Sequence, residues 1–142
     1  MNQRAVFDSS TLVGALLRNG SVPDQALKRA LNSFELCFCP QLFDELEAVF
    51  SRRRFERYVS KEARQVFLDV LRQHGRMFPI SPSDLDGVSP PCRDAKDNML
   101  LALASVSQAD VIVSSDNDLL VLHPWRGVSI LTPSRFLTQF EV

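Results

Sequence analysis

Short apolar runs alternate with longer amphipathic segments along the chain, and this alternation predicts its secondary structure. Runs of strand length occur near residues 4–8, 35–39, 77–80, 110–114 and 128–131. Strands that alternate with helices are typical of βαβ units, in which helices cover both faces of a parallel sheet. The pattern therefore predicts an α/β fold, a three-layer α/β/α sandwich with a central, mainly parallel sheet of about five strands.

Capping residues and apolar faces predict helices between these strands. The expected helices span residues 11–18, 21–32, 40–51, 60–74 and 94–108. The apolar stripe of the fourth comprises Val66, Phe67, Val70 and Leu71, and the last helix is apolar nearly all round, as in a buried helix. Residues 81–93 hold three prolines and a glycine, which predicts an irregular surface loop.

Length and composition favour one folded domain over residues 1–142. The chain is 45% hydrophobic and 23% charged, without a repeat, which is ordinary for a globular protein. The longest apolar run is too short to cross a bilayer, and residues 1–7 lack the order of a signal peptide, so we expect a cytoplasmic protein. Three cysteines do not suit a disulfide framework, and buried thiols are a better interpretation than a zinc site.

Two of the predicted strands end in an aspartate. Asp8 follows Ala5-Val6-Phe7, and Asp116 follows the strand near residues 110–114. Ligands of open parallel sheets bind outside the carboxyl ends of the strands, so these two carboxylates can converge there. Asp118 is expected to cap or turn the chain after Asp116.

Two predicted helices add further acidic candidates. Asp94 suits the N-cap of the buried helix, whereas Asp97 lies inside it and needs a partner or a metal, unless it only complements the helix dipole. In the helix over 40–51, Glu45 borders the apolar stripe, whereas Glu47 points elsewhere and Asp44 can be solvated. Glu45 is therefore the chosen candidate from that helix.

A cluster of such carboxylates requires compensation. Two unit negative charges about 5 Å apart repel by roughly 3 kcal/mol at an effective dielectric of about 20. A divalent metal removes this repulsion, and oxygen ligands alone point to Mg²⁺ or Mn²⁺. Such sites catalyse phosphodiester cleavage without a histidine base or serine nucleophile. The chain also lacks the glycine-rich motifs of nucleotide-binding proteins.

Basic residues gather in one segment of the chain. Residues 52–64 contain Arg52, Arg53, Arg54, Arg57, Lys61 and Arg64 against only two glutamates. Such a cluster can contact the phosphates of a substrate, with Arg52, Arg53 and Arg54 as the candidates. Cations at the solvated end of a helix, offsetting its dipole, are an equal alternative.

Three segments in this order resemble the PIN-domain family, small Mg²⁺-dependent ribonucleases that include VapC-like toxins of bacterial toxin–antitoxin pairs. They read VFDSSTLVGALL, PQLFDELEAVFSRRRF and CRDAKDNMLLALASVSQADVIVSSDNDLL, and they span nearly the whole chain. The resemblance implies a catalytic metal site of Asp8, Glu45, Asp97 and Asp116. It also implies supporting roles for Asp94, Asn98, Ser114 and Asp118.

The resemblance carries expectations about partners, and it has two departures. It implies an RNA substrate, a small cognate antitoxin protein and a homodimer. The family often has Asp-Thr-Asn and Thr-Gly-Asp where this chain has Asp8-Ser9-Ser10 and Ser114-Ser115-Asp116. Neither departure removes a metal ligand, but both bear on catalytic rate.

Two other functions stay open. The first is a non-catalytic PIN fold that serves as an RNA- or protein-binding scaffold, although a scaffold has no reason to retain four mutually repelling acids. The second is a phosphatase with Asp8 as the nucleophile, which asks for a second acid at Ser10 or beside Asp8 that the chain lacks.

Overall fold

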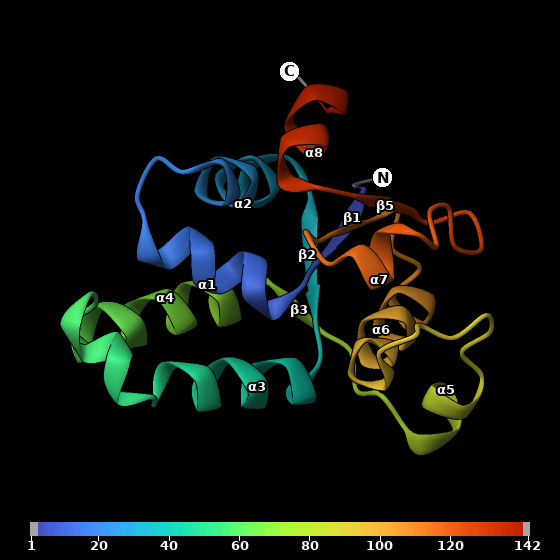
Figure 1. Cartoon of the computed structure of the whole chain (residues 1–142), viewed down its shortest axis with the longest axis horizontal. Helices are drawn as coiled ribbons and strands as arrows, with labels where there is room; N and C mark the ends of the chain where they lie inside the picture. Colours follow the sequence, from blue (N-terminus) through green and yellow to red (C-terminus); the bar gives the residue numbers. More distant parts are fainter. Residues whose placement is uncertain (1–2, 141–142) are drawn as a thin grey trace.

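A computed structural model, which describes residues 3–140, has the predicted α/β architecture. Its five strands are all parallel and lie in the order β3-β2-β1-β4-β5. The strands are β1 (Arg4–Phe7), β2 (Glu35–Phe38), β3 (Arg76–Met77), β4 (Val111–Val113) and β5 (Ser129–Leu131). In Figure 1, helices α1 to α4 lie on one side of this sheet and α5 and α6 on the other. The α/β/α prediction is confirmed.

Eight α-helices and two 3₁₀ turns complete the described part of the chain. They are α1 (Ser9–Leu17), α2 (Val22–Ser33), α3 (Pro40–Phe50), η1 (Arg53–Arg57), α4 (Lys61–His74), α5 (Pro82–Asp86), η2 (Ala95–Asp97), α6 (Asn98–Ser107), α7 (Asn117–Leu120) and α8 (Pro133–Gln139). The five predicted helices all exist within a few residues of their expected bounds. The last one differs most, since it starts as a 3₁₀ turn and becomes α-helical only at Asn98.

The prediction that residues 81–93 contain no regular structure is wrong. Ser81 and Asp84 form a reciprocal capping box around the first turn of α5. Pro82 occupies the first turn, where a proline removes no hydrogen bond that the helix would otherwise make. A helix this short carries too little apolar periodicity to be detected in the sequence. The same reason applies to α7, and the short helix α8 was not predicted either.

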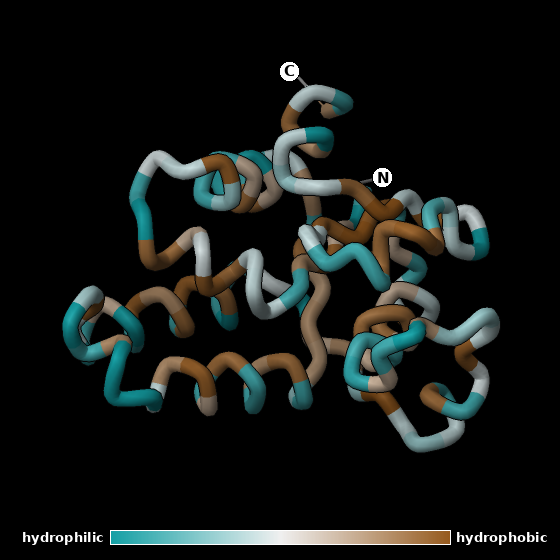
Figure 2. Tube along the Cα trace, viewed as in Figure 1, coloured by the Kyte–Doolittle hydropathy of each residue, from teal (hydrophilic) through white to brown (hydrophobic). Residues whose placement is uncertain are grey.

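The core lies between the sheet and its helices, and Figure 2 shows apolar colouring along the central strands. Val6, Phe7 and Ile112 are fully buried, and five successive residues of α6, Leu100 to Ala104, are buried as predicted. The predicted stripe of α4 is partly wrong. Its buried residues are Leu68 and Leu71, whereas Val66 is 60% exposed because that side of the helix faces solvent.

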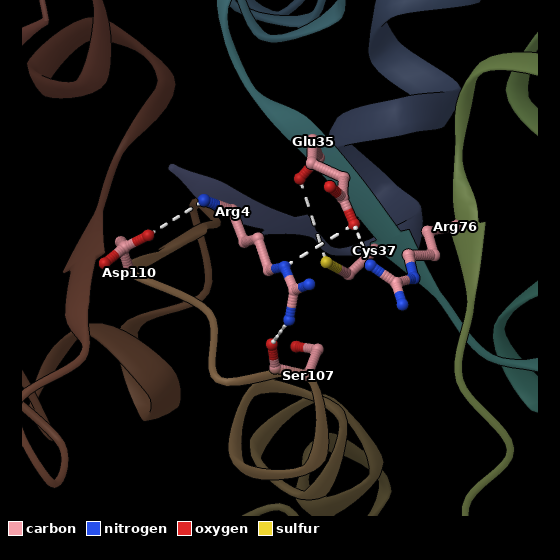
Figure 3. Close-up of polar contacts among 6 residues, drawn as sticks. All are labelled: Arg4, Glu35, Cys37, Arg76, Ser107 and Asp110. Atoms are coloured by element: carbon pink, nitrogen blue, oxygen red, sulfur yellow. Dashed lines mark hydrogen bonds and ion pairs between the residues drawn. The ribbon is translucent and has the colours of Figure 1, made fainter. Parts of the chain in front are cut away.

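A charged network ties the amino ends of the strands together. Glu35 on β2 accepts a hydrogen bond from Arg76 Nη1 at 3.1 Å and lies 3.5 Å from Arg4 Nε. Arg4 Nη1 also donates to the carbonyl of Ser107 at 2.7 Å, at the C-terminus of α6 (Figure 3). Arg4 therefore joins β1, β2 and α6 at the sheet edge opposite the strand ends that carry Asp8 and Asp116.

No helix within residues 3–140 combines the length and the apolar character that a membrane crossing would need.

Gly75 provides a test of the packing between α4 and the sheet. A Cβ atom at Gly75 would collide with the Phe38 ring and lie 2.6 Å from the Leu71 carbonyl oxygen. We expect Gly75→Ala to lower the free energy of unfolding by about 1–3 kcal/mol, measured by urea denaturation. Gly14→Ala is the matched control, because its Cβ would meet Pro23 at an ordinary 3.6 Å inside α1. The control should be neutral or stabilising by up to about 1 kcal/mol, and equal losses in both variants would contradict this packing.

Candidate metal centre

Asp8 leaves the carboxyl end of β1 and turns the chain into α1. Its backbone N–H donates to the Val113 carbonyl at 3.2 Å, which continues the pairing between β1 and β4. Its side chain is the N-cap of α1, with Oδ1 accepting the Thr11 N–H at 2.8 Å. Oδ2 accepts a short hydrogen bond from the Ser114 hydroxyl. Asp8 is 5% exposed, so its carboxylate is held in one position.

Ser114 connects the two aspartates that end neighbouring strands. Its fully buried hydroxyl donates to Asp8 and accepts the Asp116 N–H at 3.0 Å. Asp116 in turn caps α7, where its Oδ1 accepts the Asp118 N–H at 2.9 Å. The residue that caps α7 is therefore Asp116, and not Asp118 as expected. Asp118 contributes the backbone N–H that the cap accepts. One buried serine thus sets the relative positions of Asp8 and Asp116.

Asp94 and Asp97 reach the same edge of the sheet from the loop before α6. Asp94 caps the η2 turn as predicted, accepting the Lys96 N–H at 3.1 Å. Asp97 lies at the start of α6 and not inside it, which corrects the expected position. A 3₁₀ turn has three residues per turn, so residues three apart share one side. Carboxylate oxygens of Asp94, Asp97 and Asp116 lie within 4.8 Å of one another.

The proximity of these carboxylates changes the pKa of Asp97. Burial, together with a hydrogen bond to Asp116 and the charges of nearby carboxylates, raises the pKa of Asp97 from its usual 3.8 to about 7. The negative charges of Asp116, Asp94 and Asp8 act in the same direction. Within residues 3–140, no charged side-chain nitrogen of a lysine, arginine or histidine lies within 4.0 Å of these four carboxylates. Protonation of Asp97 would relieve this repulsion when no cation is bound.

The loop before α6 is fixed by Cys92 and Asn98. The Asn98 carboxamide oxygen accepts the Cys92 N–H at 2.7 Å. The Cys92 thiol lies 3.3 Å from the Asp118 carbonyl oxygen and 3.8 Å from Asp97 Oδ2. Burial raises the pKa of this thiol above its ordinary value. The sequence identified Cys92 only as a loop thiol, since nothing in its spacing signals contact with residues 26 positions away.

Glu45 stands apart from the other predicted ligands. It lies exposed on α3, which starts directly after the carboxyl end of β2, and its charge acts on the nearby Cys39. Its carboxylate is not one of the three that converge within 4.8 Å. Its neighbour Glu47 forms a short ion pair with Arg72 of α4, and Asp44 is exposed. The structure thus brings Asp94, Asp97 and Asp116 together, links Asp8 to Asp116 through Ser114, and leaves Glu45 outside the group of three.

The basic residues of the sequence form a surface of their own. Helix α3 ends at Phe50 and has no basic residue in its last turn, so cations offsetting that helix dipole are not what the structure shows. Arg53, Arg54 and Arg57 instead belong to the η1 turn, at the end of the α3–α4 pair that lies farthest from α6 in Figure 1. Arg52 occupies the N-cap position of this turn, and its side chain makes no capping hydrogen bond.

Comparison with known proteins identifies the family. The PIN-domain family profile matches residues 4–118, so the chain belongs to the PIN-domain family. A comparison with curated proteins gave no significant match.

Solved structures of other proteins share the fold. PAE2754 from Pyrobaculum aerophilum superposes with a TM-score of 0.62 at 15% identity, over 96% of this chain and 88% of that one. VapBC2 from Rickettsia felis, solved bound to a DNA fragment from their promoter, gives a TM-score of 0.59 at 12% identity, over 90% and 97% of the two chains. At these identities the likeness extends to the fold.

The donor set suits a hard divalent cation. Every close ligand atom is a carboxylate oxygen, and Mg²⁺ and Mn²⁺ prefer such ligands. A proton at Asp97 occupies the role that a cation would fill, because either one reduces the mutual repulsion of the carboxylates.

The raised pKa of Asp97 predicts how the stability of the metal-free protein depends on pH. The unfolded chain releases this proton near pH 3.8, whereas the folded chain keeps it up to about pH 7, so stability falls as pH rises between these values. Asp97→Asn removes this loss. In chelator, we expect the variant to melt above the wild type at pH 8 and to lose most of that advantage at pH 5.

Asp86→Asn serves as the control for this measurement, because Asp86 is an exposed carboxylate of α5 outside the cluster. Its melting temperature should follow that of the wild type at both pH values. If Asp97→Asn were less stable than the wild type at pH 8, the ionised Asp97 side chain would not destabilise the folded state.

Proposed function

We propose that this chain is a divalent-metal-dependent endoribonuclease and the toxin of a toxin–antitoxin pair that acts in the cytoplasm. The observation that carries the proposal is the convergence of Asp94, Asp97 and Asp116 into one group with a raised pKa at its centre. Membership of the PIN-domain family supports it, because the members that this sequence resembles are metal-dependent ribonucleases.

Asp97 and Asp116 would be the central ligands of Mg²⁺ or Mn²⁺, with Asp8 and Asp94 beside them. When bound, the cation would supply stabilisation of the negative charge that develops on the phosphodiester in the transition state. Ser114 acts as a positioning residue, since it orders Asp8 and the Asp116 backbone through one hydroxyl. We retain Glu45 as a proposed ligand because α3 begins at the same edge of the sheet.

Toxin–antitoxin pairing is the finer part of the proposal. The sequence resemblance to VapC-like toxins supports it, and so does the fold shared with a VapBC protein. A small antitoxin that covers the acidic edge would keep the nuclease inactive. Homodimer formation remains a prediction from the resemblance.

Metal binding can be measured directly by calorimetric titration with Mn²⁺ at pH 7.5. We expect Asp97→Asn and Asp116→Asn to weaken binding by about 100-fold or more, because each removes a charged ligand. Glu45→Gln is compared with Glu47→Gln, a substitution two residues further along the same helix. The comparison decides whether Glu45 belongs to the site. Equal affinities in these two glutamate variants would remove Glu45 from the ligand set, and wild-type affinity in Asp97→Asn would reject the metal centre.

Cleavage can be tested by sequencing the 5′ ends of total RNA after expression of wild type, Asp97→Asn and the control Asp86→Asn. New 5′ ends should appear with the wild type and the control, and fall by about 100-fold or more in Asp97→Asn. Purified wild type should lose the same activity in chelator and regain it with Mg²⁺ or Mn²⁺. Undiminished cleavage in both chelator and Asp97→Asn would contradict the proposed function.

A further inference from the structure

The η1 turn forms a cationic surface with one exposed aromatic ring, away from the carboxylates. Arg53, Arg54, Glu56, Arg57 and Tyr58 line an open hollow of about 530 Å³. This lining carries three guanidinium groups and one carboxylate. The Tyr58 side chain is 72% exposed, the second most exposed of the large apolar and aromatic residues in the described chain. Figure 2 shows hydrophilic colouring at this end of the molecule.

Packing and backbone hydrogen bonds hold the η1 turn in place. Phe55, 5% exposed, packs against Phe50 of α3 with a ring-centroid distance of 6.0 Å. The Tyr58 and Val59 N–H groups both donate to the Phe55 carbonyl, at 3.1 and 3.0 Å. Arg64 of α4 donates to the Phe50 carbonyl at the end of α3. The outward residues of η1 are therefore presented from a turn that is anchored to α3, and Arg64 joins the end of α3 to α4.

The arginines of this surface form no ion pair with the described residues of the protein. Among residues 3–140, no carboxylate lies within 4.0 Å of a charged nitrogen of Arg53, Arg54 or Arg57. The Arg54 guanidinium lies 5.6 Å from the Phe55 ring centre, a contact that leaves its N–H donors free for other partners. By contrast, Arg72 and Arg76 pair with Glu47 and Glu35. Arg53, Arg54 and Arg57 are therefore available for partners outside the chain.

We propose that the hollow formed by Arg53, Arg54, Arg57 and Tyr58 is a binding subsite for single-stranded nucleic acid. Guanidinium groups contact the phosphates of such a strand, and an exposed aromatic ring stacks on an unpaired base. Paired bases would not offer their faces to Tyr58, so a single strand fits this combination better than a duplex does. An acidic protein would pair with the arginines but offers no unpaired base to stack on the Tyr58 ring.

This inference rests on the proposed function and adds a second contact to it. Helix α3 runs from the carboxyl end of β2 to η1, and its 11 residues span about 16 Å. The subsite therefore lies well away from the carboxylates, and a substrate must extend over several nucleotides to reach both. RNA shorter than that would lose the contribution of the subsite, whereas longer single strands would be bound at both places.

Fluorescence anisotropy in chelator tests binding without cleavage. The probe is a fluorescein-labelled oligouridylate of about 12 nucleotides, within the range of single-strand sites. We expect Tyr58→Ala to raise its Kd by about fivefold or more, and Tyr58→Phe to stay within about twofold of the wild type, because the ring remains. The triple variant Arg53→Ala, Arg54→Ala, Arg57→Ala should reduce the slope of log K against log salt by up to about 2.

Arg18→Ala and Arg135→Ala are the matched controls, since both are exposed arginines on other elements. They should leave the Kd near the wild-type value, and all variants should keep the wild-type melting temperature, because each altered side chain is exposed. Unchanged Kd values in Tyr58→Ala and the triple variant would overturn the subsite. Labelled polyglutamate that binds as tightly as the RNA, and weakens equally in Tyr58→Ala, would also overturn it in favour of an acidic protein partner.

Measuring cleavage in parallel separates the two proposals. Loss of RNA affinity in Tyr58→Ala together with cleavage that requires Asp97 supports both. Cleavage with an unchanged kcat/KM in the subsite variants rejects the subsite and leaves the nuclease standing. Binding that depends on Tyr58, without cleavage by the wild type in any divalent metal, supports the subsite and rejects the nuclease.

Discussion

Mutual repulsion among carboxylates at the carboxyl edge of the parallel sheet is the constraint on which the site depends. Parallel pairing between β1 and β4 brings the ends of both strands to one edge, and each of those ends carries an aspartate. The η2 turn delivers two more from the other side. Such a group is tolerated only when a proton or a cation offsets its charge, and burial with the neighbouring carboxylates raises the pKa of Asp97 and so favours its protonated form.

The remainder of the fold holds this edge in place. Asp8 and Asp116 each cap a helix while they face the cluster, so the same hydrogen bonds that start α1 and α7 also orient the carboxylates. Ser114 couples the two caps through a buried hydroxyl. At the opposite edge, Arg4 and Arg76 share Glu35, so charges of opposite sign are paired within the protein. Opposite charges therefore meet at one edge of the sheet, and like charges gather at the other.

The sequence predicted the architecture because its signals were long and regular. Five strands and five helices could be recognised from apolar periodicity and from caps such as Ser21 and Ser60. Helix α5 escaped detection because prolines read as breakers, although Pro82 occupies a first-turn position that tolerates one. Val66 was misplaced because the periodicity of α4 does not state which of two adjacent faces packs against the protein.

The site was predictable only where the strands define it. Asp8 and Asp116 follow from the topology, and Asp97 follows from the cost of a charge beside a buried helix. Asp94 was assigned a supporting role, because the sequence does not reveal the 3₁₀ turn that places it near Asp97. Glu45 was placed in the site because it borders the apolar face of its helix. That pattern gives the direction of the side chain but not its distance from the carboxylates on the strands.

Proton release on metal binding tests the central claim most directly. Mn²⁺ titrations at pH 6, in two buffers with different ionisation enthalpies, give the number of protons displaced per ion bound. If a cation replaces the proton held at Asp97, whose pKa is about 7, close to one proton should be released, and none in Asp97→Asn. Metal binding without proton release, or no binding at all, would contradict the account.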